Sequence, residues 1–221
     1  MSFPTKIEIL LPSWLTETTV NAFISTISPD SCLVSAEQQM ELAIWLAGQN
    51  VEHESGGPFG AAVFERDNGR LLSVGVNVVV ATKNSLAHAE IMALMLAQRA
   101  IGTYDLGLNA AKVLVTSAQP CVQCYGAIWW SGIEKLVIGA TAEDVELYTR
   151  KLATSCSSDS AEQAVWTAGF NEGPLREDWV ECLESKDWRR ELNTLEVIRD
   201  VRRQEACEVL KKYASHGGLI Y

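Results

Sequence analysis

The hydrophobic and polar positions of the chain follow helical spacing after residue 35. The apolar residues Met40, Ile44 and Ala47 recur three or four positions apart, which is the spacing of one helix face. Ser35 stands three residues before Gln38, as the N-cap and the third helical residue do in a capping box. The pattern predicts a first core helix that begins directly after Ser35.

The next segments change to the pattern of β-strands. Residues 61–64 and 71–80 are largely apolar, and the Asp-Asn-Gly sequence of residues 67–69 is typical of a tight turn. The Gly-Gly-Pro sequence of residues 56–58 separates these strands from the preceding helix. We therefore expect an antiparallel β-hairpin.

Helices and strands alternate through the rest of the chain. The patterns predict strands at residues 111–117, 135–139 and 195–198, and helices at residues 85–97, after Pro120 and at residues 202–213. Ser85 is a candidate cap of the first of these helices, and Pro120 suits the start of the second. Such alternation is typical of a layered α/β domain, and the hairpin makes part of its sheet antiparallel.

One domain accounts for most of the length. Residues 1–34 contain several Thr, Ser and Pro residues, so we expect an arm that packs on the core through Trp14. Residues 35–221 are then a single domain, since a chain of 221 residues suffices for one core of about 150 residues with additions.

Charge bears on the kind of substrate. With 18 basic and 28 acidic residues, the formal net charge is −10. Nucleic-acid binding draws much of its affinity from cationic contacts with phosphate, so a polynucleotide substrate is disfavoured. We interpret the basic pairs as solvated helix faces; they are Arg189-Arg190, Arg202-Arg203 and Lys211-Lys212.

The sequence also indicates a cellular setting. It has no run of 18 or more apolar residues, and its first residues lack the order of a signal peptide. Its six cysteines fit a reducing compartment better than a disulfide framework. We expect a cytoplasmic protein without a disulfide and without a membrane partner.

Two short segments carry the chemistry: His88-Ala89-Glu90 and, about thirty residues later, Pro120-Cys121-Val122-Gln123-Cys124. One imidazole and two thiolates can hold Zn²⁺ and leave a fourth position open for water, as in catalytic zinc sites. Bound zinc lowers the pKa of water to about 7, and Glu90 would then be free to move protons. We predict one Zn²⁺ held by His88, Cys121 and Cys124.

Other interpretations of these cysteines are open. A Cys-x-x-Cys pair alone is also typical of a redox site or of half of a structural zinc site. A structural zinc would need a fourth ligand, and each remaining candidate stands outside any motif with a second ligand: Cys32, Cys156, Cys182, Cys207, His53 and His216. The combined motif instead matches the zinc nucleobase deaminases, in which the Glu is the general acid and base.

The chain resembles the cytidine deaminase superfamily and, within it, the bacterial guanine deaminases. The resemblance rests on residues 57–61, 76–77 and 121–131 and on the Gly-Phe-Asn-Glu sequence within residues 168–174. It implies a three-layer α/β/α fold with a mixed, roughly five-stranded sheet. It also implies a homodimer and a C-terminal tail that closes the site.

The resemblance implies roles for individual residues. Glu90 matches the proton shuttle, and Glu172 matches a second catalytic acidic residue near the leaving amino group. The implied substrate contacts are Asn77, Phe59, Ala89 and, in the tail, Tyr221. The sequence departs from the family at Gln119, where Glu is common, and in an apparently longer segment at residues 145–168.

The sequence thus predicts zinc-dependent hydrolytic deamination of a free purine base, guanine to xanthine and ammonia. Another deaminase of the superfamily is an alternative, acting on guanosine, cytosine, an aminotriazine or a tRNA adenosine. A non-catalytic binding module stabilised by zinc is a second alternative, which the presence of Glu90 disfavours because structural zinc does not need it.

Overall fold

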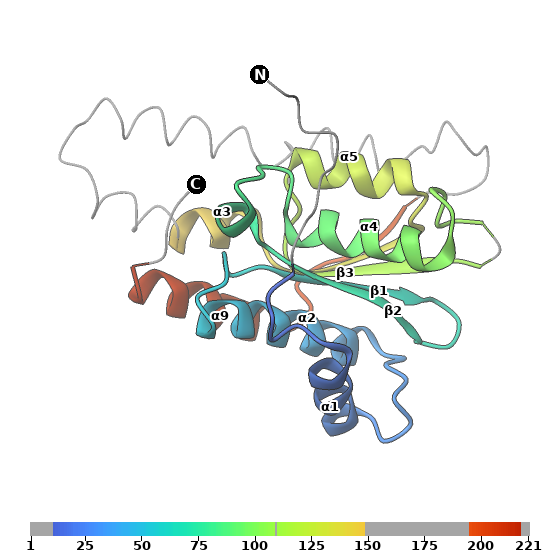
Figure 1. Ribbon diagram of the computed structural model, residues 1–221, viewed down its shortest axis with the longest axis horizontal. Coiled ribbons are helices and arrows are strands. Elements are labelled where there is room, and N and C mark those ends of the chain that lie inside the picture. Colours follow the sequence, from blue (N-terminus) through green and yellow to red (C-terminus); the bar gives the residue numbers. More distant parts are fainter. Residues whose placement is uncertain (1–10, 109, 149–194, 218–221) are drawn as a thin grey trace.

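A computed structural model describes residues 11–108, 110–148 and 195–217 (Figure 1). These residues form a five-stranded sheet in the order β2-β1-β3-β4-β5. β1 pairs antiparallel with β2 and with β3, whereas β3, β4 and β5 are parallel. The strands span Gly60–Glu65 (β1), Leu71–Val76 (β2), Lys112–Ala118 (β3), Lys135–Ala140 (β4) and Glu196–Ile198 (β5). The predicted hairpin and the mixed sheet are both confirmed.

Helices cover both faces of the sheet, with α2 and α9 on one face and α4 and α5 on the other (Figure 1). Residues 142–148 are also helical. The helices with complete bounds are Glu17–Ile27 (α1), Ala36–Glu52 (α2), Val79–Thr82 (α3), Ala89–Ile101 (α4), Val122–Ser131 (α5) and Arg203–Ser215 (α9). This is the predicted three-layer α/β/α arrangement.

The alternation of side chains along β1 divides the core into two parts. Ala62 and Phe64 pack in the cluster that contains Met40 of α2, while Ala61 and Val63 pack in the cluster on the opposite face. Successive side chains of a strand point to opposite faces, so a strand between two helical layers is buried on both faces and is mostly apolar. All seven residues of β3 are buried for the same reason.

The first core helix begins as its sequence predicts. The Ser35 hydroxyl accepts a hydrogen bond from the Gln38 backbone N–H (3.1 Å), and the Gln38 side-chain oxygen accepts one from the Ser35 N–H (3.2 Å). This reciprocal capping box satisfies two N–H groups that the first turn would leave without partners.

The prediction of a strand over residues 71–80 is wrong beyond Val76. The Asn77 side-chain oxygen accepts a hydrogen bond from the Val79 N–H (3.3 Å), and the short helix α3 follows. Val78 is 1% exposed and Val79 is 7% exposed, so their apolar character reflects burial in the core. Hydrophobicity alone does not distinguish a buried strand from a buried turn.

The prediction that Ser85 caps a helix is also wrong. α4 begins at Ala89 with His88 as its N-cap, so the imidazole that the sequence predicts as a zinc ligand stands at the helix boundary. Asn84 forms a turn before it, since its carbonyl oxygen accepts from the Ala87 N–H (3.0 Å) and its side-chain oxygen accepts from the Leu86 N–H (3.0 Å). An Asn side chain that bonds the backbone two residues later competes with helix formation.

The N-terminal region contains a helix that its sequence did not reveal. α1 begins after Thr16, which forms a capping box with Thr19. Before it, the Trp14 ring stacks on His53 (5.4 Å between ring centroids) and meets Trp45 edge-on (6.2 Å). These contacts join residues from Trp14 onward to α2 and its C-terminal end.

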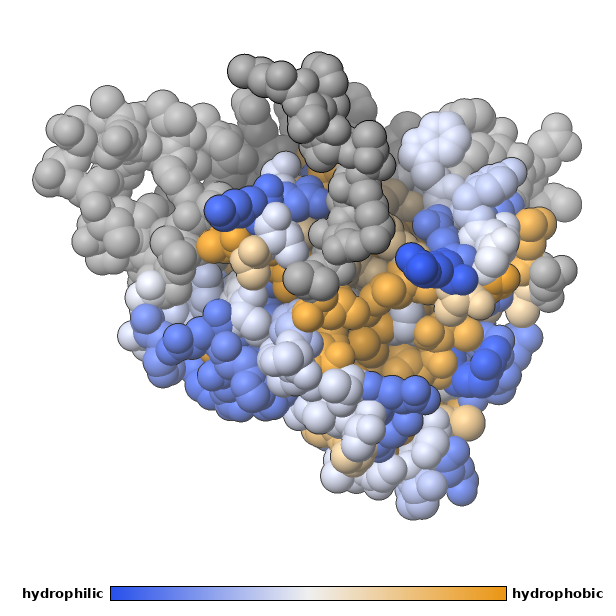
Figure 2. Space-filling view, in the orientation of Figure 1, coloured by the Kyte–Doolittle hydropathy of each residue, from blue (hydrophilic) through white to orange (hydrophobic). Residues whose placement is uncertain are grey.

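α9 is amphipathic, as predicted. Its inward residues Ala206, Cys207 and Leu210 are buried, and the surface over α9 is hydrophilic whereas apolar residues gather near the middle of the same view (Figure 2). Among the described residues, no helix is long and apolar enough to cross a membrane. The described cysteines Cys32, Cys121, Cys124 and Cys207 are free thiols.

Candidate metal centre and active site

Two helix N-termini bring the three predicted zinc ligands together. His88 is the N-cap of α4, Cys121 is the N-cap of α5, and Cys124 lies in the first turn of α5. The Sγ atoms of Cys121 and Cys124 each lie 3.6 Å from His88 Nδ1 and 3.7 Å from one another. Residues that are 33 positions apart in the chain therefore form one compact triangle of ligand atoms.

The dimensions of this triangle fit zinc. With Zn–S bonds of about 2.3 Å and Zn–N bonds of about 2.0 Å, a tetrahedral ion separates its ligand atoms by roughly 3.5–3.8 Å. The observed distances of 3.6 and 3.7 Å fall in this range. Among the His, Cys, Asp and Glu side chains of the described residues, His88, Cys121 and Cys124 are the group close enough together to hold a metal ion. The group offers three protein ligands and not four.

The thiols of this site have strongly shifted proton affinities. The hydrogen bond between Cys121 and Cys124, together with the nearby His88, lowers the pKa of the Cys121 thiol to about 4. The same hydrogen bond to Cys121, together with burial, raises the pKa of the Cys124 thiol. A bound dication would remove the proton from Cys124 as well, because a coordinating thiol is deprotonated.

Glu90 lies in the first turn of α4 and is only 6% exposed. Burial is the main reason why the pKa of its carboxyl group is raised, and the charge of Cys121 raises it further. Its carboxyl group also interacts with His88 and with the Cys124 side chain. A carboxyl group therefore stands beside the three ligands without being one of them.

A close contact between β2 and α4 holds this helix start in place. A Cβ atom at Gly75 would lie 2.1 Å from the Ala89 carbonyl oxygen and 2.5 Å from the Ala93 backbone nitrogen. The Ser73 hydroxyl donates a hydrogen bond to the Ala93 carbonyl oxygen (2.7 Å). Since no larger residue fits at Gly75, this position of β2 fixes how near His88 and Glu90 come to the sheet.

The loop that leads into the cysteine segment is held by the start of the helix at residues 142–148. The Gln119 side-chain oxygen accepts a hydrogen bond from the Ala142 N–H (3.3 Å), and the Gln119 N–H donates to the Ala140 carbonyl oxygen (2.8 Å). Gln119 thus supplies a neutral acceptor at the position where the resembling family commonly has Glu.

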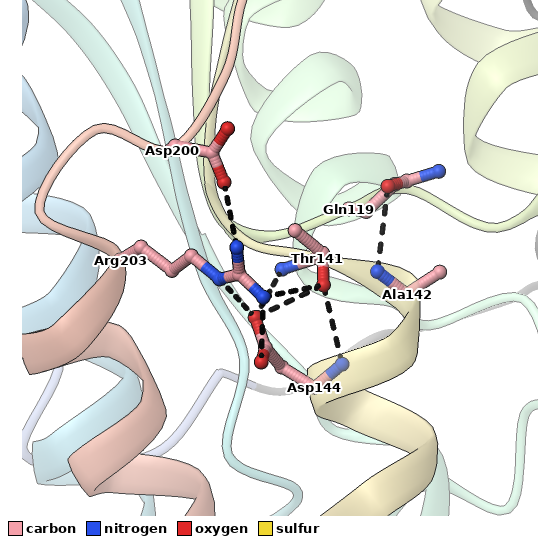
Figure 3. A network of polar contacts seen from close by, with 6 residues as sticks. All are labelled: Gln119, Thr141, Ala142, Asp144, Asp200 and Arg203. Atoms are coloured by element: carbon pink, nitrogen blue, oxygen red, sulfur yellow. Dashed lines mark hydrogen bonds and ion pairs between the residues drawn. The ribbon is translucent and has the colours of Figure 1, made fainter.

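Asp144 stabilises the same helix start and joins it to α9 (Figure 3). Its carboxylate accepts from the Thr141 N–H (2.9 Å) and forms two bonds with the Arg203 guanidinium, at 2.7 and 3.1 Å. These partners, Arg203 first, lower the pKa of Asp144 from 3.8 to about 2. The network is charge-assisted and bidentate, which is the stronger class of ion pair.

We expect Asp144→Asn to lower the free energy of unfolding by about 1 kcal/mol at pH 7, a modest value because Arg203 is partly solvated. The pKa of Asp144 is depressed in the folded state, so this contribution is present above pH 3.8 and is lost as the pH falls through about 2. Urea unfolding of both proteins between pH 7 and pH 2.5 measures the effect. A difference between them that stays constant down to pH 2.5 would contradict it.

The other predicted site residues are divided between described and undescribed parts of the chain. Asn77 and Ala89 are buried, at 1% and 0% exposure, and Phe59 is partly buried beside the start of β1. The Asn77 N–H donates to the Phe59 carbonyl oxygen (3.2 Å), so these two residues are neighbours. Glu172 and Tyr221 lie outside the described residues.

Sequence reasoning missed Asn50, which is fully buried and bonds the backbone of Asn77. A signal for it exists, because Asn50 lies three positions after Ala47 on the buried face of α2. A polar residue in an apolar helix stripe needs buried partners.

Residues 34–140 match the family model of the cytidine and deoxycytidylate deaminase zinc-binding region. The guanine deaminase of Bacillus subtilis is 36% identical over 95 residues, which are 43% of this chain and 58% of that protein. The match thus spans less than two thirds of this curated relative. tRNA-specific adenosine deaminases are among the other curated relatives.

Similarity to solved structures extends further along the chain. The guanine deaminase of Nitrosomonas europaea is 35% identical, with 97% of this chain and 100% of that chain covered and a TM-score of 0.73. A structure in complex with 2,6-diaminopurine is 39% identical, with 86% and 87% covered and a TM-score of 0.69. Given this extent, and the convergence of His88, Cys121 and Cys124 within the matched region, the chain belongs to the cytidine deaminase superfamily, in the branch that contains the guanine deaminase of Nitrosomonas europaea.

Proposed function

We propose that this protein catalyses the zinc-dependent hydrolysis of guanine to xanthine and ammonia. The observation that carries the proposal is the buried carboxyl group of Glu90 beside the three-ligand centre of His88, Cys121 and Cys124. End-to-end similarity to a guanine deaminase and similarity to a purine complex support guanine as the base.

The chain's own residues divide the work of the reaction. A zinc ion held by His88, Cys121 and Cys124 would supply Lewis acidity. It would lower the pKa of the attacking water, so that hydroxide is available as the nucleophile at neutral pH. Glu90 accepts a proton from the attacking water and transfers it to the ring nitrogen beside the reacting carbon. The oxygen of the water forms a bond to the carbon that bears the amino group, and this carbon becomes tetrahedral. The remaining proton of the added hydroxyl then passes to the amino group, the C–N bond breaks, and ammonia and xanthine are the products.

The base is held by residues around this centre. Asn77 bonds the edge of the purine ring, Phe59 and His88 lie against its faces, and Ala89 is a further contact of the base. Glu172 passes a proton to the departing amino group, and Tyr221 covers the base. The roles of Glu172 and Tyr221 rest on the family resemblance alone.

A polynucleotide substrate is disfavoured by the distribution of basic residues. Both described basic pairs form ion pairs with carboxylates of the same chain: Arg202 with Glu41 and Glu205, Arg203 with Asp144 and Asp200, Lys211 with Glu208, and Lys212 with Glu52. Cations already paired in this way offer little to phosphate, which favours a free base over a tRNA.

We further propose that the protein is a cytoplasmic homodimer with an arm at residues 1–34 and a deaminase domain at residues 35–221. Free thiols suit a reducing compartment. Large apolar side chains on α4 and α5 are exposed and would be covered in a dimer; they are Met95 at 47%, Val122 at 51% and Trp130 at 64%.

An ammonia-release screen with the zinc-loaded protein tests the proposed reaction. We expect turnover of guanine and little or none of cytosine, cytidine, adenosine or a tRNA anticodon stem. Turnover of another substrate without guanine would replace the assignment with a different deaminase. Full zinc content with no ammonia from any of them would indicate a binding module stabilised by zinc.

A further inference from the structure

Asn50 uses its buried side chain to hold two backbone carbonyl groups. Its Nδ2 atom donates to the Gly57 oxygen (2.8 Å) and to the Asn77 oxygen (2.8 Å), and its Oδ1 atom accepts from the Ser55 hydroxyl (2.8 Å). These contacts fix the orientation of the amide, because the reverse orientation would face Oδ1 toward two carbonyl oxygens. At 0% exposure, Asn50 has protein partners for both amide hydrogens and for its oxygen.

Ser55 extends this connection to the N-terminal region. Its hydroxyl donates to Asn50 and accepts a hydrogen bond from the Trp14 indole N–H (2.9 Å). Trp14 is itself held by its stacking contact with His53. A continuous chain of hydrogen bonds therefore runs from Trp14 through Ser55 and Asn50 to the backbone of Asn77.

The loop that contains Ser55 also makes a close backbone contact with Asn77. A Cβ atom at Gly56 would lie 1.8 Å from the Asn77 carbonyl oxygen and 2.9 Å from Asn50 Nδ2. Only glycine fits at this distance, so the loop and the end of β2 form a close backbone contact. The position of the Asn77 backbone thus depends on residues 50–57 in addition to the strand β2 that precedes it.

The residue after Asn77 is connected to the segment that carries His88. The Val78 N–H donates to the carbonyl oxygen of Ala87 (3.0 Å), the residue before His88. The Asn77 side-chain oxygen accepts from the Val79 N–H (3.3 Å), which sets the direction of its amide. A shift of the Asn77 backbone would therefore change where the amide points relative to a base beside His88.

We infer that Asn50 and Ser55 are positioning residues that orient Asn77 for purine binding, and that Trp14 acts on the same residue through Ser55. This inference rests on the proposed function, in which Asn77 bonds the base. It assigns a role in substrate affinity to a region far from the zinc motif in sequence. The role is in binding and not in the proton transfers, which belong to Glu90.

Ser55→Ala is the main test, because it removes the hydrogen bonds of the hydroxyl with Trp14 and Asn50 with little change in volume. We expect KM for guanine to rise about 3- to 10-fold, the effect of roughly one hydrogen bond, with kcat and zinc content nearly unchanged. Trp14→Phe should act in the same direction and more weakly, because it keeps an aromatic ring against His53. Unchanged KM in Ser55→Ala would overturn the inference.

Ser131→Ala is the matched control. Ser131 is buried, whereas Ser55 is partly buried, and its hydroxyl likewise donates a hydrogen bond to a backbone carbonyl, that of Ile128 (2.8 Å), but it lies at the far end of α5 from the metal ligands. We expect a similar loss of thermal stability with unchanged KM. An equal rise of KM in this variant would show that lost stability, and not positioning of Asn77, produced the effect.

A double-mutant cycle with Asn77→Ala separates this inference from the proposed function. If Ser55 acts through the Asn77 amide, Ser55→Ala should raise KM in the wild-type background and not in the Asn77→Ala background. Additive effects would overturn the inference while guanine turnover, and with it the proposed function, stands.

Amide hydrogen exchange gives a readout that needs no substrate. We expect faster exchange at Asn77 and Val78 in Ser55→Ala than in the wild type or in Ser131→Ala, since their N–H groups bond Phe59 and Ala87. Unchanged exchange at both amides would overturn the coupling. If the wild type did not turn over guanine, the proposed function would fail, and this measurement would still decide whether Ser55 positions Asn77.

Discussion

Glu90→Gln should retain zinc and lose nearly all turnover. The ligands His88, Cys121 and Cys124 are unchanged in this variant, and an amide of the same shape replaces a carboxyl group that is not itself a ligand. A general acid and base contributes about 10²- to 10⁴-fold to a rate, and Glu90 has both tasks in the proposed reaction. We therefore expect kcat for guanine to fall at least about 100-fold.

Zinc content by atomic absorption and ammonia release, measured on the same preparation, check this result. Glu205→Gln is a suitable control, because Glu205 is an exposed residue of α9 that pairs only at the surface with Arg202. It should keep full turnover. Ammonia release at the wild-type rate by the Glu90 variant would remove this residue from the proton transfers.

Cys124→Ala should lose both zinc and activity. The thiol of Cys124 is one of only three protein ligands within the described residues, and its removal leaves two. Loss of an outer-shell partner alone costs roughly 10- to 100-fold in metal affinity, and loss of a direct ligand should cost more. We expect well under one zinc per chain after dialysis and no measurable release of ammonia from guanine.

Cys207→Ala is the matched control, since Cys207 is also a buried free thiol but belongs to α9 and lies in a cluster with Ala118 and Ala140, at the ends of β3 and β4. It should bind one zinc and keep its turnover.

For the wild type, a chelator should abolish activity and added Zn²⁺ should restore it. Full activity of the chelated wild type, with zinc verified to be absent, would contradict a zinc-dependent reaction.

The sequence predicted the two cysteines of the metal site because their spacing is local. Cys121 and Cys124 are three positions apart, so a single helical turn brings their side chains together wherever the helix lies. The capping box at Ser35 and the hairpin of β1 and β2 were predictable for the same reason. Each depends on residues within a few positions of one another.

Boundaries that depend on competing local bonds were less predictable. Residues 78–80 have the hydrophobicity of a strand, but the Asn77 side chain bonds the Val79 N–H and begins a short helix. Likewise, Asn84 forms a turn before α4, so the N-cap of this helix is His88 and not the predicted Ser85. Both outcomes follow from a side chain that competes with the regular backbone pattern.

By itself, the sequence predicted the three side chains that form the metal site, proposed Glu90 for the proton transfers, and indicated the layered order of helices and strands. Only the tertiary structure decided that His88 lies 3.6 Å from Cys121, that Gly75 admits α4 so close to β2, and that Asn50 holds Asn77. The physical reason is that ligand chemistry and periodicity are properties of short segments. The partner of a buried carbonyl group is chosen by packing between segments that are distant in the chain.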